Sequence, residues 1–139
     1  MPAKDKIHQA VKEALKKEGW QVTDDPLVIF IKDDNVAIDL GAEKWLFAEK
    51  GIKKIAVEVK SFTSPSLFYS FHEALGQYLN YETALQESEE ERELFLAISS
   101  KVYKSLLDNY IVKKSLSRFN LRLLIIEIDS EEISEWIRS

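Results

Sequence analysis

The sequence has no cysteine and only two histidines among its 139 residues. Without cysteine the chain has no disulfides and no thiolate metal sites, and two histidines are too few for an imidazole-rich site. Any metal ion that the protein binds must therefore be held by oxygen ligands. Glycine and proline are scarce, with four and three residues, and they form no linker-like stretch. With 45% hydrophobic residues to build a core, the sequence predicts one domain over residues 1–139.

Long apolar runs are missing as well. The N-terminal residues alternate charged and apolar side chains, unlike a signal peptide, and no apolar run approaches the length of a membrane span. We therefore expect a cytoplasmic protein with no membrane partner.

The net charge of -5 at pH 7 disfavours non-specific coating of nucleic acid. Two groups of lysines are compatible either with a local basic patch or with ordinary solvated surface. The first group is Lys50, Lys53, Lys54 and Lys60, and the second is Lys101, Lys104, Lys113 and Lys114.

Three segments have the spacing of apolar residues that is typical of amphipathic helices. The first helix is predicted over residues 4–18. The second is predicted over residues 66–87, with Ser66 placed to cap its N-terminus. The third covers residues 102–119 and is expected to break near Tyr110.

Runs of β-branched and aromatic residues between turn signals predict five strands, over residues 27–31, 36–40, 54–60, 93–98 and 122–128. Residues 45–49 are expected to be extended and to turn at Lys50 and Gly51 into the third strand. The sequence leaves residues 131–139 open between strand and helix. The resulting order, αβββαβαβ, predicts an α/β (α+β) fold in which helices flank a mixed central sheet.

Charged residues stand out in two of these apolar strands. Glu58 and Lys60 are separated by one residue, so their side chains project from the same face of the strand. Asp39 lies near the end of the preceding predicted strand, and a hairpin between the two strands would make the two acids neighbours. One interpretation of Glu58 and Lys60 is a partly exposed ion pair of little energetic value. The other is a catalytic site that also includes Asp39.

The catalytic interpretation predicts a divalent-metal site. The carboxylates of Asp39 and Glu58 and the backbone carbonyl of Val59 are the hard oxygen ligands that Mg²⁺, or Mn²⁺ in its place, prefers. Such a set leaves coordination positions for water and a phosphate. Lys60 is expected to neutralise the phosphate or to orient the attacking water.

These residues resemble the PD-(D/E)xK signature of restriction-endonuclease-like nucleases. Asp39 matches the first acid, and Glu58, Val59 and Lys60 match the (D/E)xK element, although Ile38 stands where the signature has proline. The predicted order of elements is also similar to the core of that superfamily. The resemblance implies a restriction-endonuclease-like fold and Mg²⁺-dependent endonuclease activity on DNA.

Two further features add candidate nucleic-acid contacts. Gln77 and Tyr81 share one edge of the second helix and resemble the QxxxY element of RecB-like and phage-exonuclease-like nucleases, which implies that they hold the nucleic-acid strand. The alternative is a surface amide and a tyrosine packed on the sheet. His8 borders the apolar stripe of the first helix, where it could reach a phosphate or be a half-buried structural histidine. Asp25 is predicted to form a turn.

Six further stretches of the sequence are distinctive, and they are Met1 to Asp5 with His8, Gly19 and Trp20, Asp25 to Leu27, Ile38 to Lys44, Ile55 to Phe62 and Ala74 to Tyr81. Through these stretches, and over nearly its whole length, the sequence resembles the XisH family of fdxN-element excision controlling factors from cyanobacteria. This resemblance implies a role in excising a DNA element during heterocyst differentiation, alongside a site-specific recombinase and an XisI-like partner. Two interpretations stay open, a DNA-cleaving enzyme and a non-cleaving module that binds DNA or the recombinase. A homo-oligomer is also left open.

Overall fold

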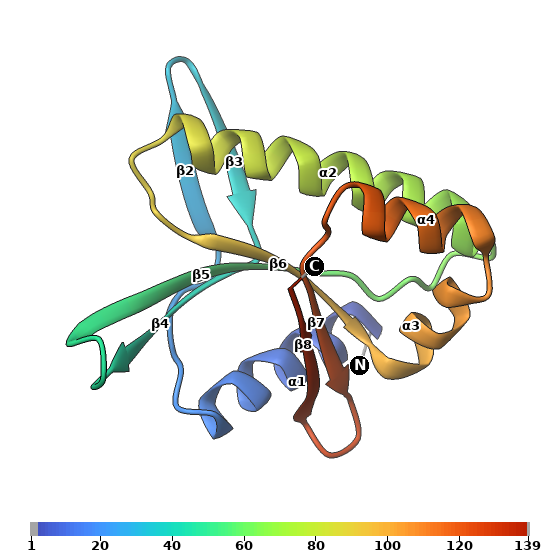
Figure 1. The fold of residues 1–139 in the computed structure, drawn as a ribbon, viewed down its shortest axis with the longest axis horizontal. Helices are drawn as coiled ribbons and strands as arrows, with labels where there is room; N and C mark the ends of the chain where they lie inside the picture. The colour runs from blue at the N-terminus through green and yellow to red at the C-terminus, as the bar shows by residue number, and fades with distance from the viewer. Residues whose placement is uncertain (1–2, 139) are drawn as a thin grey trace.

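The computed structural model describes residues 3–138, so Met1, Pro2 and Ser139 lie outside the described residues. Its elements follow in the order α1 (Ala3–Lys17), β1 (Gln21–Asp24), β2 (Leu27–Ile31), β3 (Asp34–Ile38), β4 (Leu40–Leu46), β5 (Gly51–Val59), α2 (Leu67–Glu87), β6 (Glu93–Ser99), α3 (Ser100–Leu107), α4 (Tyr110–Arg118), β7 (Leu123–Glu127) and β8 (Glu132–Ile137). In Figure 1, α1 lies on one side of the central sheet, and α2 and α4 lie on the other.

The central sheet has six strands in the order β1-β4-β5-β6-β7-β8. The strands β5, β6 and β7 are parallel, and the outer pairs β1 with β4, β4 with β5, and β7 with β8 are antiparallel. The sheet is therefore mixed, as predicted. Because the carboxyl ends of β5 and β6 meet at one edge, the residue that follows β5 lies beside the start of α3.

A separate hydrophobic core covers each face of this sheet. On one face, α1 buries residues such as Val11 and Leu15 against β5 and β7. On the other face, α2 buries Phe71 and Tyr78 together with residues of β6, α3 and α4. Both faces are covered, which explains why β6 and β7 are nearly continuous apolar runs. Within residues 3–138, no helix is long and apolar enough to cross a bilayer.

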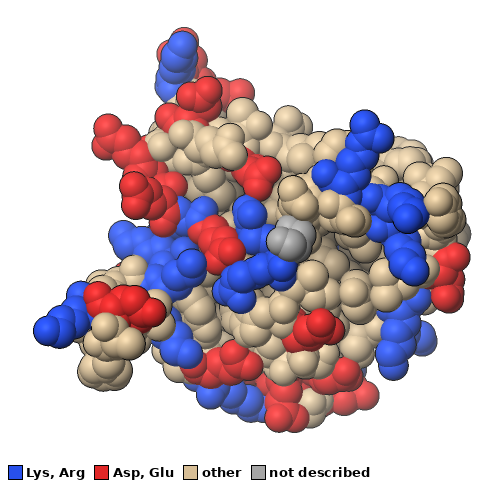
Figure 2. All heavy atoms as spheres, viewed as in Figure 1, with Lys and Arg blue, Asp and Glu red and all other residues tan. Residues whose placement is uncertain are grey.

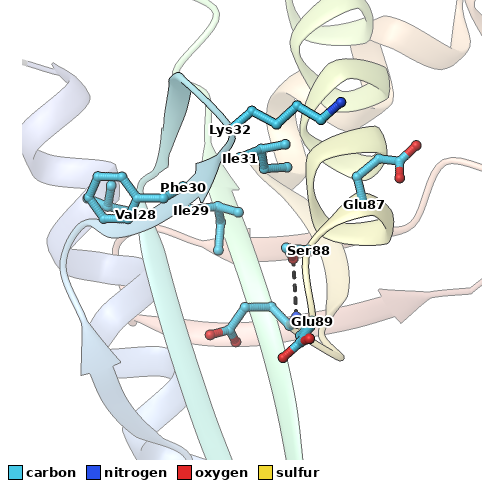
Figure 3. Close-up of a pocket in the computed structure, with 9 residues that line it drawn as sticks. Val28, Ile29, Phe30, Ile31, Lys32, Glu87, Ser88 and Glu89 are labelled. Carbon is cyan, nitrogen blue, oxygen red and sulfur yellow. Dashed lines mark hydrogen bonds between the residues drawn. The ribbon is translucent and has the colours of Figure 1, made fainter.

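The strands β2 and β3 form a hairpin of their own outside the central sheet. Ile29 and Ile31 point toward α2, whereas Val28 and Phe30 point away from it (Figure 3). Ile29 is buried and Phe30 is 76% exposed, which is the alternation expected of a strand with one covered face. The hairpin packs on α2 and adds its inner face to the core that α2 covers.

The predicted helices are confirmed within a residue or two. Ser66 caps α2, where its hydroxyl oxygen accepts from the N–H of Tyr69 at 3.1 Å. The expected break near Tyr110 divides α3 from α4, and Asn109 caps α4 by accepting from Val112.

The predicted order of strands is wrong between the first two helices, where five strands replace three. Residues 36–40 are not one strand, because the chain bends at Asp39, so that β3 ends before this residue and β4 begins after it. The hairpin before β5 turns over residues 47–50 rather than at Lys50 and Gly51. The undecided C-terminal segment contains the strand β8, which pairs with β7.

The Tyr78 side chain, 1% exposed, connects α2 to the sheet. Its hydroxyl accepts from the N–H of Arg122 at 3.2 Å and lies 3.4 Å from the carbonyl of Leu94, to which it donates. We expect Tyr78→Phe to lower the free energy of unfolding by about 1–3 kcal/mol, because it leaves buried polar groups without a partner. Urea denaturation measures this loss. The control Tyr69→Phe, at a 61% exposed position, should change stability by less than about 0.5 kcal/mol.

Candidate metal and phosphate site

The register between β4 and β5 brings the two predicted acids together. Leu40 pairs with Val57 in this antiparallel ladder, so Asp39, just before β4, lies opposite Glu58, near the end of β5. The N–H of Asp39 donates to Glu58 Oε1 at 3.2 Å, and the N–H of Val59 donates to Asp39 Oδ2 at 2.9 Å. Each carboxylate is thus oriented by the backbone of the neighbouring chain segment.

Lys60 follows β5 directly and is held at the same edge of the sheet. Its N–H donates to the carbonyl of Ala97 at 3.0 Å, so its backbone continues the ladder to β6. Its ammonium Nζ lies 3.5 Å from Glu58 Oε2, which makes it the cation beside the two carboxylates. The structure therefore places Asp39, Glu58 and Lys60 in one cluster.

Glu58 is only 6% exposed, which is unusual for a carboxylate. Its burial and the nearby charge of Asp39 raise its pKa from 4.5 to about 7, although the Lys60 ammonium opposes the shift. The site therefore holds more negative charge than one lysine balances, and Glu58 takes up a proton near neutral pH. A bound cation would favour the charged form of Glu58 and so lower its pKa.

This donor set fits a hard divalent cation. Asp39 Oδ1 and Glu58 Oε2 are the carboxylate oxygens that the two backbone N–H groups leave free, and the carbonyl of Val59 would be the third donor. Across residues 3–138, the structure has no group of three or more His, Cys, Asp or Glu that could hold a metal ion. The protein would thus supply two carboxylates, a number that suits Mg²⁺, which keeps several positions for water and phosphate oxygens.

Tyr81 on α2 lies close to this cluster. Burial raises the pKa of its hydroxyl, and the charges of Glu58 and Asp39 raise the pKa further. One helical turn earlier, the side-chain oxygen Oε1 of Gln77 is buried and has no hydrogen-bond donor among the described residues. Such a group requires a partner. Tyr81 therefore lies within reach of the charges of the site, Gln77 shares its edge of α2 through the i, i+4 spacing, and the contact of both residues with nucleic acid stays a prediction.

His8 is placed against Asp25. Its Nε2 lies 3.0 Å from Asp25 Oδ1, and Lys12 donates to Asp25 Oδ2 at 2.8 Å. The bond from Lys12, together with that from His8, lowers the pKa of Asp25. Asp25, expected only to form a turn, is thus the partner that orients His8. The role of His8 toward a phosphate stays a prediction.

Comparison with known proteins identifies the family. The model of the family described as "XisH protein" matches residues 1–134. The chain belongs to the XisH family. It is 40% identical to an XisH family protein of known structure from Nostoc punctiforme, with a TM-score of 0.86 over 96% of this chain and 100% of that chain. It is 39% identical to an fdxN element excision controlling factor protein from Anabaena variabilis, with a TM-score of 0.85 over 96% of this chain and 99% of that chain. No curated protein matches it.

In this XisH-family chain, a hollow beside Lys60 is lined by residues that the sequence analysis did not identify as candidate site residues. It is lined by Val59, Lys60 and the four residues that follow them, by Lys4 of α1, and by Ser70 and Glu73 of α2. Ser61, Thr63 and Ser64 supply hydroxyl groups that can donate to phosphate oxygens. The hydroxyl-rich run directly after the ExK motif was the signal in the sequence.

The raised pKa of Glu58 predicts how stability depends on pH. Between its unfolded value of 4.5 and its folded value of about 7, the folded chain holds a proton that the unfolded chain has lost. Stability should therefore fall as pH rises through this window. Without divalent cations, we expect Glu58→Gln to match the wild type below about pH 4 and to exceed its free energy of unfolding by a few kcal/mol at pH 8. Denaturation at both pH values measures this, and a pH-independent difference would contradict it.

Proposed function

We propose that this XisH-family protein acts in the excision of a DNA element and that its site hydrolyses DNA phosphodiester bonds with Mg²⁺ or Mn²⁺. The observation that carries the proposal is the cluster of Asp39, Glu58 and Lys60 at one edge of the sheet, with both carboxylates oriented by backbone N–H groups. The link to excision is supported by the 39% identical protein from Anabaena variabilis, which is described as an fdxN element excision controlling factor.

Each residue of the site has a distinct role in the proposed reaction. Asp39, Glu58 and the carbonyl of Val59 would hold the cation, which would supply Lewis acidity for a phosphoryl oxygen and for the attacking water. The Lys60 ammonium, now 3.5 Å from Glu58 Oε2, would face the scissile phosphate and stabilise its developing negative charge. Tyr81, Gln77 and the hydroxyl groups after Lys60 position the strand, and His8 adds a contact to a phosphate.

The architecture supports a restriction-endonuclease-like fold as part of the proposal. An antiparallel pair, β4 and β5, is joined to the parallel strands β6 and β7, and helices cover both faces. Asp39 lies just before β4 and Glu58 lies near the end of β5, and this arrangement supports the resemblance to the PD-(D/E)xK signature. By the same family resemblance, a site-specific recombinase and an XisI-like protein are the proposed partners, in the cytoplasm, and the active form could be a homo-oligomer.

The alternative function is a module that grips DNA or the recombinase without cutting. Two observations favour it: the net charge of -5, and the Lys60 ammonium that already lies 3.5 Å from Glu58 Oε2. In this case the three charged residues would form a structural cluster. Excision in cells that carry Glu58→Gln or Lys60→Ala separates the two functions, because a binding module would support excision at the wild-type level.

Nuclease activity is tested directly with purified protein and linear, nicked and branched DNA. We expect cleavage of at least one substrate with Mg²⁺ or Mn²⁺ and none with EDTA. The absence of cleavage on every substrate, at protein concentrations that saturate DNA binding, would favour the alternative.

A further inference from the structure

The helices α3 and α4 carry a charge opposite to that of the whole chain. Between Ser100 and Arg118 the sequence has five basic residues and a single acidic residue, Asp108, although the net charge of the protein is -5. We define the α3–α4 surface by these five basic residues, which are Lys101, Lys104, Lys113, Lys114 and Arg118. Figure 2 shows Lys and Arg gathered over these helices with little Asp or Glu beside them.

All five basic side chains are exposed. Within residues 3–138, none of them makes an ion pair, whereas Lys12, Lys53, Arg92, Arg122 and Arg138 each pair with a carboxylate. The buried sides of the two helices, through residues such as Leu106 and Val112, belong to the core that α2 covers. The charged side is therefore fixed in place by a packed helix pair and has no internal partner for its charge.

The α3–α4 surface begins next to the candidate site. Lys60 donates its N–H to Ala97 at the end of β6, and α3 starts three residues later, capped by Ser99. Figure 1 shows α3 and α4 on the side of the molecule where β5 leaves the sheet and α2 begins. A ligand that reaches Lys60 can thus continue across α3 and α4.

We propose that the α3–α4 surface binds the sugar–phosphate backbone of duplex DNA and guides it to the site at Lys60. This inference rests on the proposed function, because an extended polyanion is the ligand that joins a phosphate site to a neighbouring row of cations. On α4, Lys114 and Arg118 are one turn apart, about 6 Å along the helix axis, so they reach different phosphates.

The aromatic residues at the two ends of α4 favour a duplex over a single strand. Tyr110 is 72% exposed and Phe119 is 42% exposed, which would suit base stacking. However, Lys114 Nζ lies 5.4 Å from the centroid of the Tyr110 ring, and the Arg118 guanidinium lies 6.0 Å from that of Phe119. Each cation thus lies over one face of its ring and competes there with the stacking of a base. The surface therefore presents charge, which suits the backbone of a duplex.

The test measures binding of a 20-base-pair duplex in EDTA, by fluorescence anisotropy over a series of salt concentrations. The variant Lys113→Gln, Lys114→Gln, Arg118→Gln should lose at least about tenfold in affinity at low salt, and its slope of log K against log salt should become shallower by about 2–3. The control Lys16→Gln, Lys17→Gln, Lys32→Gln removes the same charge at exposed positions on other elements and should keep most of the affinity. The pair Lys101→Gln, Lys104→Gln provides a second, independent reduction, and thermal melting checks that each variant is folded.

Unchanged duplex binding by the folded α4 variant, an equal loss in the control, or a loss confined to single-stranded DNA would each overturn the inference. Binding in EDTA and cleavage in Mg²⁺ are separate readouts. A wild-type protein that binds through this surface and never cleaves would overturn the nuclease proposal alone, and cleavage without any role of these residues would overturn the inference alone.

Discussion

Replacing Glu58 with glutamine is expected to abolish Mg²⁺-dependent cleavage of DNA. The amide keeps the shape of the side chain and can still accept from the N–H of Asp39, but it removes one of two carboxylates from the cation site. We expect Mg²⁺ affinity to fall and DNA affinity in EDTA to stay similar or rise, since repulsion of phosphate decreases. Cleavage assays, calorimetric titration with Mg²⁺ and anisotropy measure the three effects.

The matched control for this variant is Glu49→Gln. Glu49 is exposed in the turn between β4 and β5, so its replacement makes the same change of charge and shape away from the site. The control should cleave like the wild type. Full activity of Glu58→Gln, with Mg²⁺ affinity unchanged, would remove Glu58 from the site and with it the basis of the proposed mechanism.

Replacing Lys60 with alanine is expected to reduce the rate of cleavage about a hundredfold or more. This is the scale on which enzymes lose rate when one electrostatic stabiliser of the transition state is removed. Mg²⁺ binding should be nearly intact, because Lys60 contacts Glu58 without being a ligand itself. Single-turnover cleavage at saturating Mg²⁺ isolates the effect on rate.

The control Lys54→Ala removes an exposed lysine from the same face of β5, opposite Glu43 in the ladder with β4. It should change the rate little. Equal loss in both variants would assign the effect to general attraction of DNA, and a rate unchanged in Lys60→Ala would exclude this residue from catalysis.

The sequence predicted which charged residues lie together better than it predicted the strands around them. The alternation of side chains in residues 54–60 placed Glu58 and Lys60 on one face, and the ion pair between them agrees with this placement. Asp39 was expected inside a strand, but it lies at the bend between β3 and β4. Asp39 and Glu58 still lie close together. Asp39 directly precedes Leu40, which pairs with Val57, so Asp39 lies opposite Glu58 just as a residue within the strand would.

The missed strand and the separate hairpin depend on contacts between distant residues. The strand β1 has four residues that alternate between exposed and half-buried, a pattern too short to stand out in the sequence. Its end is held by Arg92, whose guanidinium lies 3.4 Å from Asp24 and also donates to the carbonyl of Ile55. No local pattern could indicate that a basic residue within an acidic run would be buried against two other strands.

The central claim is that Asp39 and Glu58 hold one divalent cation, and anomalous diffraction from crystals grown with Mn²⁺ tests it most directly. The account predicts an anomalous peak within coordination distance of both carboxylates and of the Val59 carbonyl, with the Lys60 ammonium moved away from Glu58, and no such peak in Glu58→Gln crystals. A wild-type structure at saturating Mn²⁺ that has no peak between these carboxylates, with Lys60 still 3.5 Å from Glu58, would contradict it.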